Sequence, residues 1–269
     1  MSDLTGKVAV VTGGGGILCS AMSQALAAQG ATVAVLDLMP EAAQRVVDQI
    51  GQSGGKAIAV QANVLKRDSL QAAAETIHQE CGPVDLLVNG AGGNKAEATA
   101  SDEMSFFDVP PEAIQWVFNL NCLGTILACQ VFVPDMVEKK EGVVINIASM
   151  AGIRPLTRIL AYSAAKAAVA NFTQWLAVHL AQGYSPKIRV NAIAPGFFLT
   201  EQNRFLLEDE ATGKPTPRGK TILAHTPAGR YGAPEDLLGT LLWLAGDESA
   251  FVSGTIIPVD GAFAAFGGV

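Results

Sequence analysis

The chain has 269 residues, 49% of them hydrophobic, which is enough to bury a substantial core in one large domain or two small ones. Its 18 Lys and Arg residues against 25 Asp and Glu residues give a net charge of −7, which argues against a nucleic-acid-binding surface. Residues 1–7 are polar and do not resemble a signal peptide, and no window is expected to supply the ~20 apolar residues that cross a bilayer. We therefore expect a cytoplasmic protein without a nucleic-acid or membrane partner.

Short apolar runs alternate with helical patterns along the whole chain. Residues 7–12 (KVAVVT) end in glycines and are followed by helical Ala/Leu spacing over residues 20–29. The next run, residues 32–36, precedes a helix-like segment over residues 41–50. Further apolar runs lie at residues 57–60, 84–88, 143–148, 188–193 and 255–259. Such alternation is typical of βαβ units, and predicts a single α/β domain over residues 1–269 with a doubly wound parallel sheet covered by helices on both faces.

One segment interrupts this rhythm. Residues 197–232 contain Pro215, Pro217 and Pro227 and a mixture of charges. Loops of this length in a compact domain are usually lids or binding loops, so we expect a substrate-binding region here. A disordered surface excursion is the alternative.

The four cysteines, Cys19, Cys81, Cys122 and Cys129, form no CxxC pair and have no clustered histidines. They are typical of reduced, buried thiols, and no metal site is predicted.

A glycine-rich loop and a carboxylate indicate dinucleotide binding. Residues 12–19 (TGGGGILC) lie between the first strand and the following helix, where backbone N–H groups can approach a pyrophosphate. Asp37 ends the second strand, ~20 residues further on, where a carboxylate would hold ribose hydroxyls. A carboxylate repels a 2′-phosphate and no Lys or Arg lies nearby, so NAD(H) is favoured over NADP(H). The alternatives are an ordinary turn and a solvated aspartate.

Tyr162 and Lys166 are the candidate proton-transfer pair. Their spacing of four residues places both on one face of a predicted helix. A free tyrosine has a pKa near ~10, and an ammonium one turn away favours the phenolate. Hydride transfer to a carbonyl needs a proton partner of this kind. A short YxxxK match also arises by chance on exposed helices.

Ser149 and Asn121 strengthen this interpretation. Ser149 follows the strand at residues 143–148, at the edge where such a sheet places its ligands, and its hydroxyl can donate to a substrate oxygen. Asn121, in NLNCLG, is a helical amide that needs a partner, and a water or a backbone carbonyl could relay protons between it and Lys166. Asn119 is the neighbouring alternative.

Together these residues resemble the short-chain dehydrogenase/reductase family over nearly the whole chain. The matching pieces are residues 12–19 with Asp37, NGAG at residues 89–92, Asn121, Ser149, Tyr162 with Lys166, and Pro195–Gly196 with Thr200. The resemblance implies a Rossmann-type fold of about seven strands. It also implies a homotetramer assembled through the helices near residues 112–138 and 161–182.

The same resemblance implies roles for particular residues. Tyr162 would be the general acid/base, Lys166 would modify its pKa and bind the nicotinamide ribose, Ser149 would polarise the carbonyl, and Asn121 would hold a relay water. The implied cofactor-binding residues are Gly13, Gly16, Ile17, Leu18, Asp37, Asn63, Val64, Asn89, Gly90, Ala91, Gly92, Tyr162, Lys166, Pro195, Gly196, Phe198 and Thr200.

Two departures from the family pattern stand out. In the usual Thr-Gly-x-x-x-Gly-x-Gly motif, Ile17 and Cys19 occupy the second and third glycine places, and Gly16 stands one residue early. Cys19 must therefore pack where only a hydrogen is usual. Asn63 replaces an aspartate that often caps the adenine, and an amide can do that work.

The substrate expectation is a sugar acid. Residues 91–94, 148–157 and 194–207 resemble the subgroup of D-mannonate oxidoreductases, or fructuronate reductases. The expected substrate-binding residues are Asn94, Ser149, Arg154, Tyr162, Gln202 and Arg204, with Arg154 or Arg204 as the carboxylate partner. A gluconate 5-dehydrogenase-like enzyme, a 3-oxoacyl-carrier reductase and a non-catalytic dinucleotide sensor remain alternatives.

Overall fold

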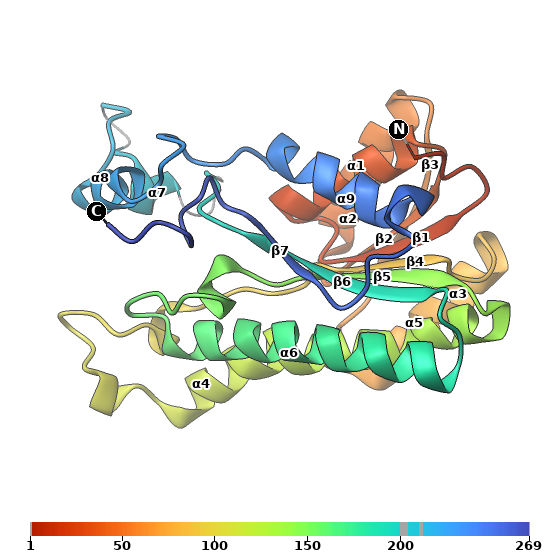
Figure 1. Ribbon diagram of the computed structural model, residues 1–269, viewed down its shortest axis with the longest axis horizontal. Coiled ribbons are helices and arrows are strands. Elements are labelled where there is room, and N and C mark those ends of the chain that lie inside the picture. Colours follow the sequence, from red (N-terminus) through yellow and green to blue (C-terminus); the bar gives the residue numbers. More distant parts are fainter. Residues whose placement is uncertain (1, 200–203, 210–211, 269) are drawn as a thin grey trace.

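The computed structural model describes residues 2–199, 204–209 and 212–268, which form one parallel sheet between two layers of helices (Figure 1). The strands are β1 Val8–Thr12, β2 Thr32–Asp37, β3 Lys56–Gln61, β4 Leu86–Asn89, β5 Gly142–Ile147, β6 Ile188–Pro195 and β7 Ile256–Val259. Their order across the sheet is β3-β2-β1-β4-β5-β6-β7. The predicted seven-stranded, doubly wound α/β fold is confirmed.

The helices divide between the two faces of the sheet. They are α1 Ile17–Ala28, α2 Pro40–Gln52, α3 Arg67–Glu80, α4 Pro111–Phe118, α5 Gly124–Lys139, α6 Leu160–Gly183, α7 Arg204–Leu207, α8 Pro217–Ala224 and α9 Leu238–Ala245. Short helical turns are η1 Ala96–Ala98, η2 Phe106–Asp108, η3 Asn119–Leu123, η4 Met150–Gly152, η5 Pro234–Leu237 and η6 Asp247–Ser249. Helices α1, α2 and α9 cover one face, and α3, α5 and α6 cover the other, with α4 against α6 (Figure 1).

The two faces of β1 explain why its sequence is continuously apolar. Val8 and Val10 belong to the core shared with α3, α5 and α6, whereas Ala9 and Val11 belong to the core shared with α1, α2 and α9. Successive side chains of a strand point to opposite faces, so a strand covered on both sides needs apolar residues at every position.

The chain order creates a crevice at the carboxyl edge of the sheet. From β1 the chain crosses to β2 and β3 on one side, and after α3 it returns to β4 on the other side of β1. The loops that leave β1 and β4 therefore diverge. In open α/β sheets this switch point is where ligands bind.

The prediction that no stretch of the chain is apolar enough to cross a bilayer is wrong. The continuous helix Pro111–Lys139, formed by α4, η3 and α5, is long and apolar enough to span a membrane by length and composition. Half of its apolar window is buried, because the helix packs against α3 and α6. Its hydrophobicity is thus accounted for by core packing.

The region at residues 197–232 contains α7 and α8 rather than an unstructured loop. Its two ends are joined, since the Gly232 N–H donates to the Phe197 carbonyl at 2.9 Å and the Leu199 N–H donates to the Gly232 carbonyl at 3.1 Å. The Thr216 hydroxyl caps α8 by accepting from the Gly219 N–H. Both helices lie beyond the carboxyl edge of the sheet, beside the C-terminal segment (Figure 1).

Candidate active site

A cavity of about 360 Å³ lies at the switch point between β1 and β4. It gathers the following predicted cofactor-binding residues: Gly13, Gly16, Ile17, Leu18, Asp37, Asn63, Val64, Gly90, Ala91 and Gly92. Cys19, Leu36, Leu38, Ala62 and Leu120 also line it and were not predicted as cofactor contacts. All five adjoin or lie within predicted motifs, so proximity in sequence could have found them. Leu120 belongs to NLNCLG and precedes Asn121, and the fold brings it from η3 to this cavity.

The glycine loop is built for close backbone approach. Gly13 has φ of 64°, a left-handed conformation that favours glycine, and a Cβ there would lie 2.8 Å from Ala91 Cα. Gly16 is extended and precedes α1, which begins at Ile17, not at the predicted position 20. The N–H groups of Gly14 and Gly16 donate to the carbonyls of Leu36 and Gly13. The first turn of α1 has no side-chain cap, so its N–H groups are the donors that fit a pyrophosphate.

Cys19 fits because its neighbour has no side chain. The thiol is buried, and a Cβ on Gly90 would lie only 2.1 Å from Cys19 Sγ. The volume added by cysteine at the family's glycine place is thus matched by the missing side chain at position 90. Burial raises the pKa of this thiol to about 12, so it is a neutral packing group.

The Asp37 carboxylate is held at the end of β2. Its Oδ2 accepts from the Gly15 N–H at 3.0 Å and its Oδ1 accepts from the Met39 N–H at 3.0 Å. No Lys or Arg is among the described residues that line this cavity. The site accordingly offers acceptors and N–H donors, which suit ribose hydroxyls and a pyrophosphate.

Several predicted cofactor residues lie elsewhere. The Asn89 side chain is buried inside the sheet, where Nδ2 donates to Asn146 Oδ1 at 2.9 Å, and Asn89 is not among the residues that line the cavity. Phe198 packs against Gly232, and Gly196 lies against Asp260 near β7. Pro195 is the last residue of β6, and Thr200 lies outside the described residues.

Ser149 and Tyr162 are brought together because η4 packs closely against α6. A Cβ on Gly152 would lie 2.6 Å from the Lys166 carbonyl carbon, so no larger residue fits between the two elements. Burial raises the pKa of Tyr162, and a hydrogen bond with Ser149 opposes that rise. The sequence predicts a lower value. In the structure, desolvation of the phenolate dominates.

Lys166 lies one helical turn after Tyr162 on α6 and is 4% exposed. Its Nζ donates to the Ile147 carbonyl at 2.7 Å and lies 5.7 Å from the centre of the Tyr162 ring. Burial lowers the pKa of Lys166 to about 8, although the thiols of Cys19 and Cys122 oppose this. The ammonium is therefore poised to change charge near neutral pH.

Asn121 occupies a break in the helical hydrogen-bond pattern, the π-helical η3. Its Nδ2 donates to the carbonyls of Gly93 and Val117 at 2.7 and 2.8 Å, and its Oδ1 accepts from the Gly93 N–H at 3.1 Å. The amide thus fixes the loop after β4. Because its polar atoms are all engaged, a proton relay through Asn121 would have to use its backbone carbonyl, which also accepts from Thr125.

The predicted substrate residues separate into two groups. Arg154 lines a cavity of about 520 Å³ at the carboxyl edge, and its N–H donates to the Met150 carbonyl at 2.8 Å, one turn after Ser149. Arg204 is instead paired with Glu208 at 2.5 Å. Asn94 donates to Thr99 in an exposed loop, and Gln202 lies outside the described residues.

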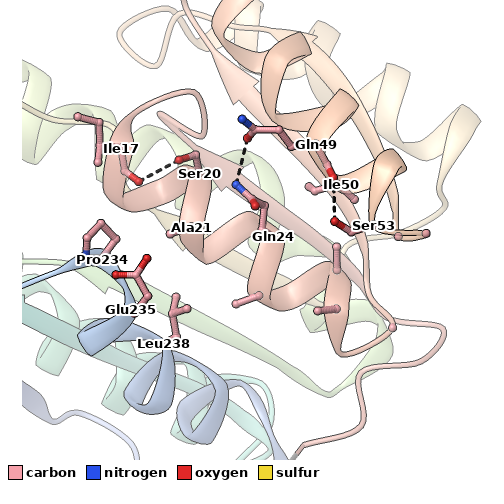
Figure 2. A pocket seen from close by; sticks show the side chains of 16 residues that line it. Ile17, Ser20, Ala21, Gln24, Gln49, Ile50, Ser53, Pro234, Glu235 and Leu238 are labelled. Atoms are coloured by element: carbon pink, nitrogen blue, oxygen red, sulfur yellow. Dashed lines mark hydrogen bonds between the residues drawn. The ribbon is translucent and has the colours of Figure 1, made fainter. Parts of the chain in front are cut away.

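Figure 2 shows another cavity, of about 830 Å³, between α1, α2 and η5. Amide side chains face it, and Gln24 Nε2 donates to Gln49 Oε1 at 3.1 Å. Ile17 alone among the predicted site residues in the described part of the chain contributes to it. This cavity is therefore separate from the one that gathers the predicted cofactor residues.

Comparison with known proteins agrees with this geometry. The family model described as short chain dehydrogenase matches residues 7–211. The uncharacterized oxidoreductase UxuB of Bacillus subtilis is 49% identical over 99% of this chain and 98% of its own length. The 5-keto-D-gluconate 5-reductase of Escherichia coli is 34% identical over 96% of each chain.

Among solved structures, a Haemophilus protein proposed to be a D-mannonate oxidoreductase, crystallised with bound NAD, has a TM-score of 0.94. It is 47% identical, and the match covers 100% of this chain and 98% of that one. The chain belongs to the short-chain dehydrogenase family. It is a nicotinamide-dependent oxidoreductase that acts on CH–OH groups.

Proposed function

We propose that this enzyme interconverts a sugar acid and its keto form with NAD(H), and that the pair is D-mannonate and D-fructuronate. The observation that carries the proposal is Arg154, which extends from the turn after Ser149 into a cavity at the carboxyl edge. A sugar acid needs a cation for its carboxylate beside the group that polarises its carbonyl. The descriptions of two relatives, one proposed to be a D-mannonate oxidoreductase and the other a 5-keto-D-gluconate 5-reductase, point to the same substrate class.

The proposed mechanism uses three side chains. Residues of the glycine loop and Asp37 would hold NAD(H), which would supply the hydride for the carbonyl carbon. The Tyr162 phenol donates its proton to the carbonyl oxygen, so one C–H and one O–H bond form. The Ser149 Oγ accepts from the Ala151 N–H at 3.1 Å, which leaves its own proton to stabilise the developing charge on that oxygen. Lys166 supplies a nearby ammonium.

Asp37 supports a preference for NAD(H). Its two carboxylate oxygens face the glycine loop and the turn after β2, and no cation among the described lining residues could neutralise a 2′-phosphate. NADP(H) would bring a dianionic group beside this carboxylate at a cost in binding free energy.

Among the two arginines considered for the carboxylate, Arg154 is the proposed partner. Arg204 already forms an ion pair with Glu208. A 5-ketogluconate reductase is the second candidate, favoured by the Escherichia coli relative. A carrier-bound 3-oxoacyl reductase would need a basic docking face, which a net charge of −7 does not favour. A sensor has no need of the assembled Ser149, Tyr162 and Lys166.

We also propose a cytoplasmic homotetramer that assembles through α4, α5 and α6. Large apolar side chains remain exposed on α4 and α6, including Trp116 at 41% and Trp175 at 56%. Exposed apolar patches of this kind mark protein interfaces.

Initial rates of NADH and NADPH oxidation with fructuronate, 5-ketogluconate and an acetoacetyl thioester test the proposed function. We expect rapid oxidation of NADH with fructuronate. Activity confined to 5-ketogluconate would select the second candidate, and activity confined to the thioester would contradict a sugar-acid substrate. Tight NADH binding without turnover of any carbonyl would support the sensor.

A further inference from the structure

The cavity that holds Arg154 has a second wall that the sequence did not predict. Its volume is about 520 Å³, and residues from four parts of the chain line it. The connection from η4 to α6 contributes Arg154 and Arg158, α8 contributes Arg218, and the C-terminal segment contributes Phe263. Phe197, two residues after the end of β6, also lines it.

This cavity is strongly cationic in an acidic protein. Three arginines line it, and no Asp or Glu is among its described lining residues. Neither Arg154 nor Arg218 has an ion pair within the described ranges, and Arg158 makes only a 3.8 Å contact with Asp102. Because arginines remain charged at all accessible pH values, the cavity keeps an uncompensated positive charge that suits an anion.

Aromatic side chains form the rest of the wall. The Phe263 ring lies 4.8 Å from the His225 ring and 5.1 Å from the Phe197 ring, and the Phe266 ring lies 5.0 Å from His225. His225 caps the end of α8, the helix that carries Arg218. These rings lower the local dielectric, which strengthens an arginine–carboxylate pair compared with one in open solvent.

The C-terminal segment is anchored where it enters this wall. Asp260 accepts from the N–H groups of Ala262 and Ala264 at 3.0 and 2.8 Å. The Gly196 N–H donates to the Val259 carbonyl at 3.0 Å, which ties the segment to the end of β6. The C-terminal segment is thus held at the end of β6, and its Phe263 and Phe266 rings contact His225 at the end of α8.

We propose that Arg218 joins Arg154 to clamp the carboxylate of the substrate, so that one anion is held between α8 and the turn after Ser149. The inference rests on the proposed function, because it assigns the part of the site that selects acids. The carboxylate binds between the two guanidinium groups, and its hydroxylated chain runs toward Ser149. Arg218 is a specificity-determining residue in this account, with no part in proton transfer.

The test uses Arg154→Leu, Arg218→Leu and the double variant that combines these two changes. The control is Lys220→Leu, a change at an exposed position of α8 outside the cavity. We expect each arginine variant to lose roughly 10- to 100-fold in kcat/KM for a keto sugar acid, mainly through KM. Rates with a neutral ketose and NADH affinity should stay within about twofold. Because both arginines share one carboxylate, the double variant should lose less than the product of the single losses.

Binding of D-mannonate and of neutral D-mannitol to the NADH complex, measured by calorimetry, provides an arm independent of turnover. If Arg218→Leu weakens the binding of mannonate but not of mannitol, the result supports the clamp, whichever acid the enzyme turns over. Equal effects of Arg218→Leu and Lys220→Leu on both ligands would overturn it while leaving the proposed function intact. Absence of keto-acid turnover and of mannonate binding in the wild-type enzyme would overturn both.

Discussion

At the scale of single residues, we expect the Asp37 carboxylate to set the preference of the site between NAD(H) and NADP(H). Its oxygens are held by the N–H groups of Gly15 and Met39. We expect the double variant Asp37→Ser with Leu38→Arg to improve kcat/KM for NADPH by about tenfold or more, because an arginine can pair with the 2′-phosphate. Steady-state kinetics with both cofactors measures the change. A preference that stays with NADH would show that Asp37 does not control it.

Lys166 makes the stability of the protein depend on pH. Its pKa is about 8 in the fold against an ordinary value of 10.5, so the unfolded chain holds a proton that the folded chain loses between these pH values. The destabilising effect of the buried ammonium is fully present below pH 8 and disappears as pH rises toward 10.5. The free energy of unfolding of wild type, minus that of Lys166→Met, should therefore rise by about 3 kcal/mol across this range.

Urea unfolding at several pH values measures this difference. The comparison with the variant is needed because burial raises the pKa of Cys19 and of Cys129 to about 12, and these thiols lower stability as pH rises through 9. A constant difference between the two proteins would show that Lys166 titrates normally in the fold.

At the scale of elements, the contact of α1 with the loop after β4 depends on the pair Cys19 and Gly90. A Cβ at position 90 would lie 2.1 Å from Cys19 Sγ. Gly90→Ala should destabilise the protein by about 1–3 kcal/mol, since the thiol cannot move away in a packed core. Removing the sulfur with Cys19→Ala should recover part of this loss in the double variant.

Chemical denaturation of the four proteins in this cycle gives the coupling between the two positions. Strictly additive losses of stability would mean that the cost of a side chain at position 90 does not come from contact with the Cys19 sulfur.

The elements also show what sequence patterns can and cannot predict. The seven strands follow from apolar runs, because strands buried on both faces leave a continuous signal. Helix α8 in the region 197–232 was missed because it is short and begins at Pro217, and such a helix is stabilised by tertiary contacts more than by periodicity.

The candidate site divides in the same way. Ser149, Tyr162 and Lys166 are close in the chain, so their spacing predicts their assembly. Arg218 reaches the same edge from a distant helix, and no spacing rule connects it to Ser149. Asn89 was assigned to the cofactor from its motif, but its side chain turns into the sheet and pairs with Asn146.

At the scale of the whole molecule, exposed tryptophans on α4 and α6 predict self-association. Trp116 of α4 and Trp175 of α6 are 41% and 56% exposed. We expect light scattering to give a mass four times 27.9 kDa, and Trp175→Glu to reduce it by placing a charge in the interface. Gln52→Glu, on the exposed end of α2, adds the same charge elsewhere and should leave the mass unchanged. A monomeric wild-type protein would contradict the assembly.

In the proposed reaction, Tyr162 transfers the proton that accompanies hydride transfer to a keto sugar acid. The most direct measurement is the rate of NADH oxidation with D-fructuronate by the wild-type enzyme and by Tyr162→Phe, together with NADH binding to each. We predict that the variant loses about 100-fold or more in kcat while binding NADH normally, because only the hydroxyl is removed. A variant that keeps the wild-type rate would contradict the claim and require another proton donor.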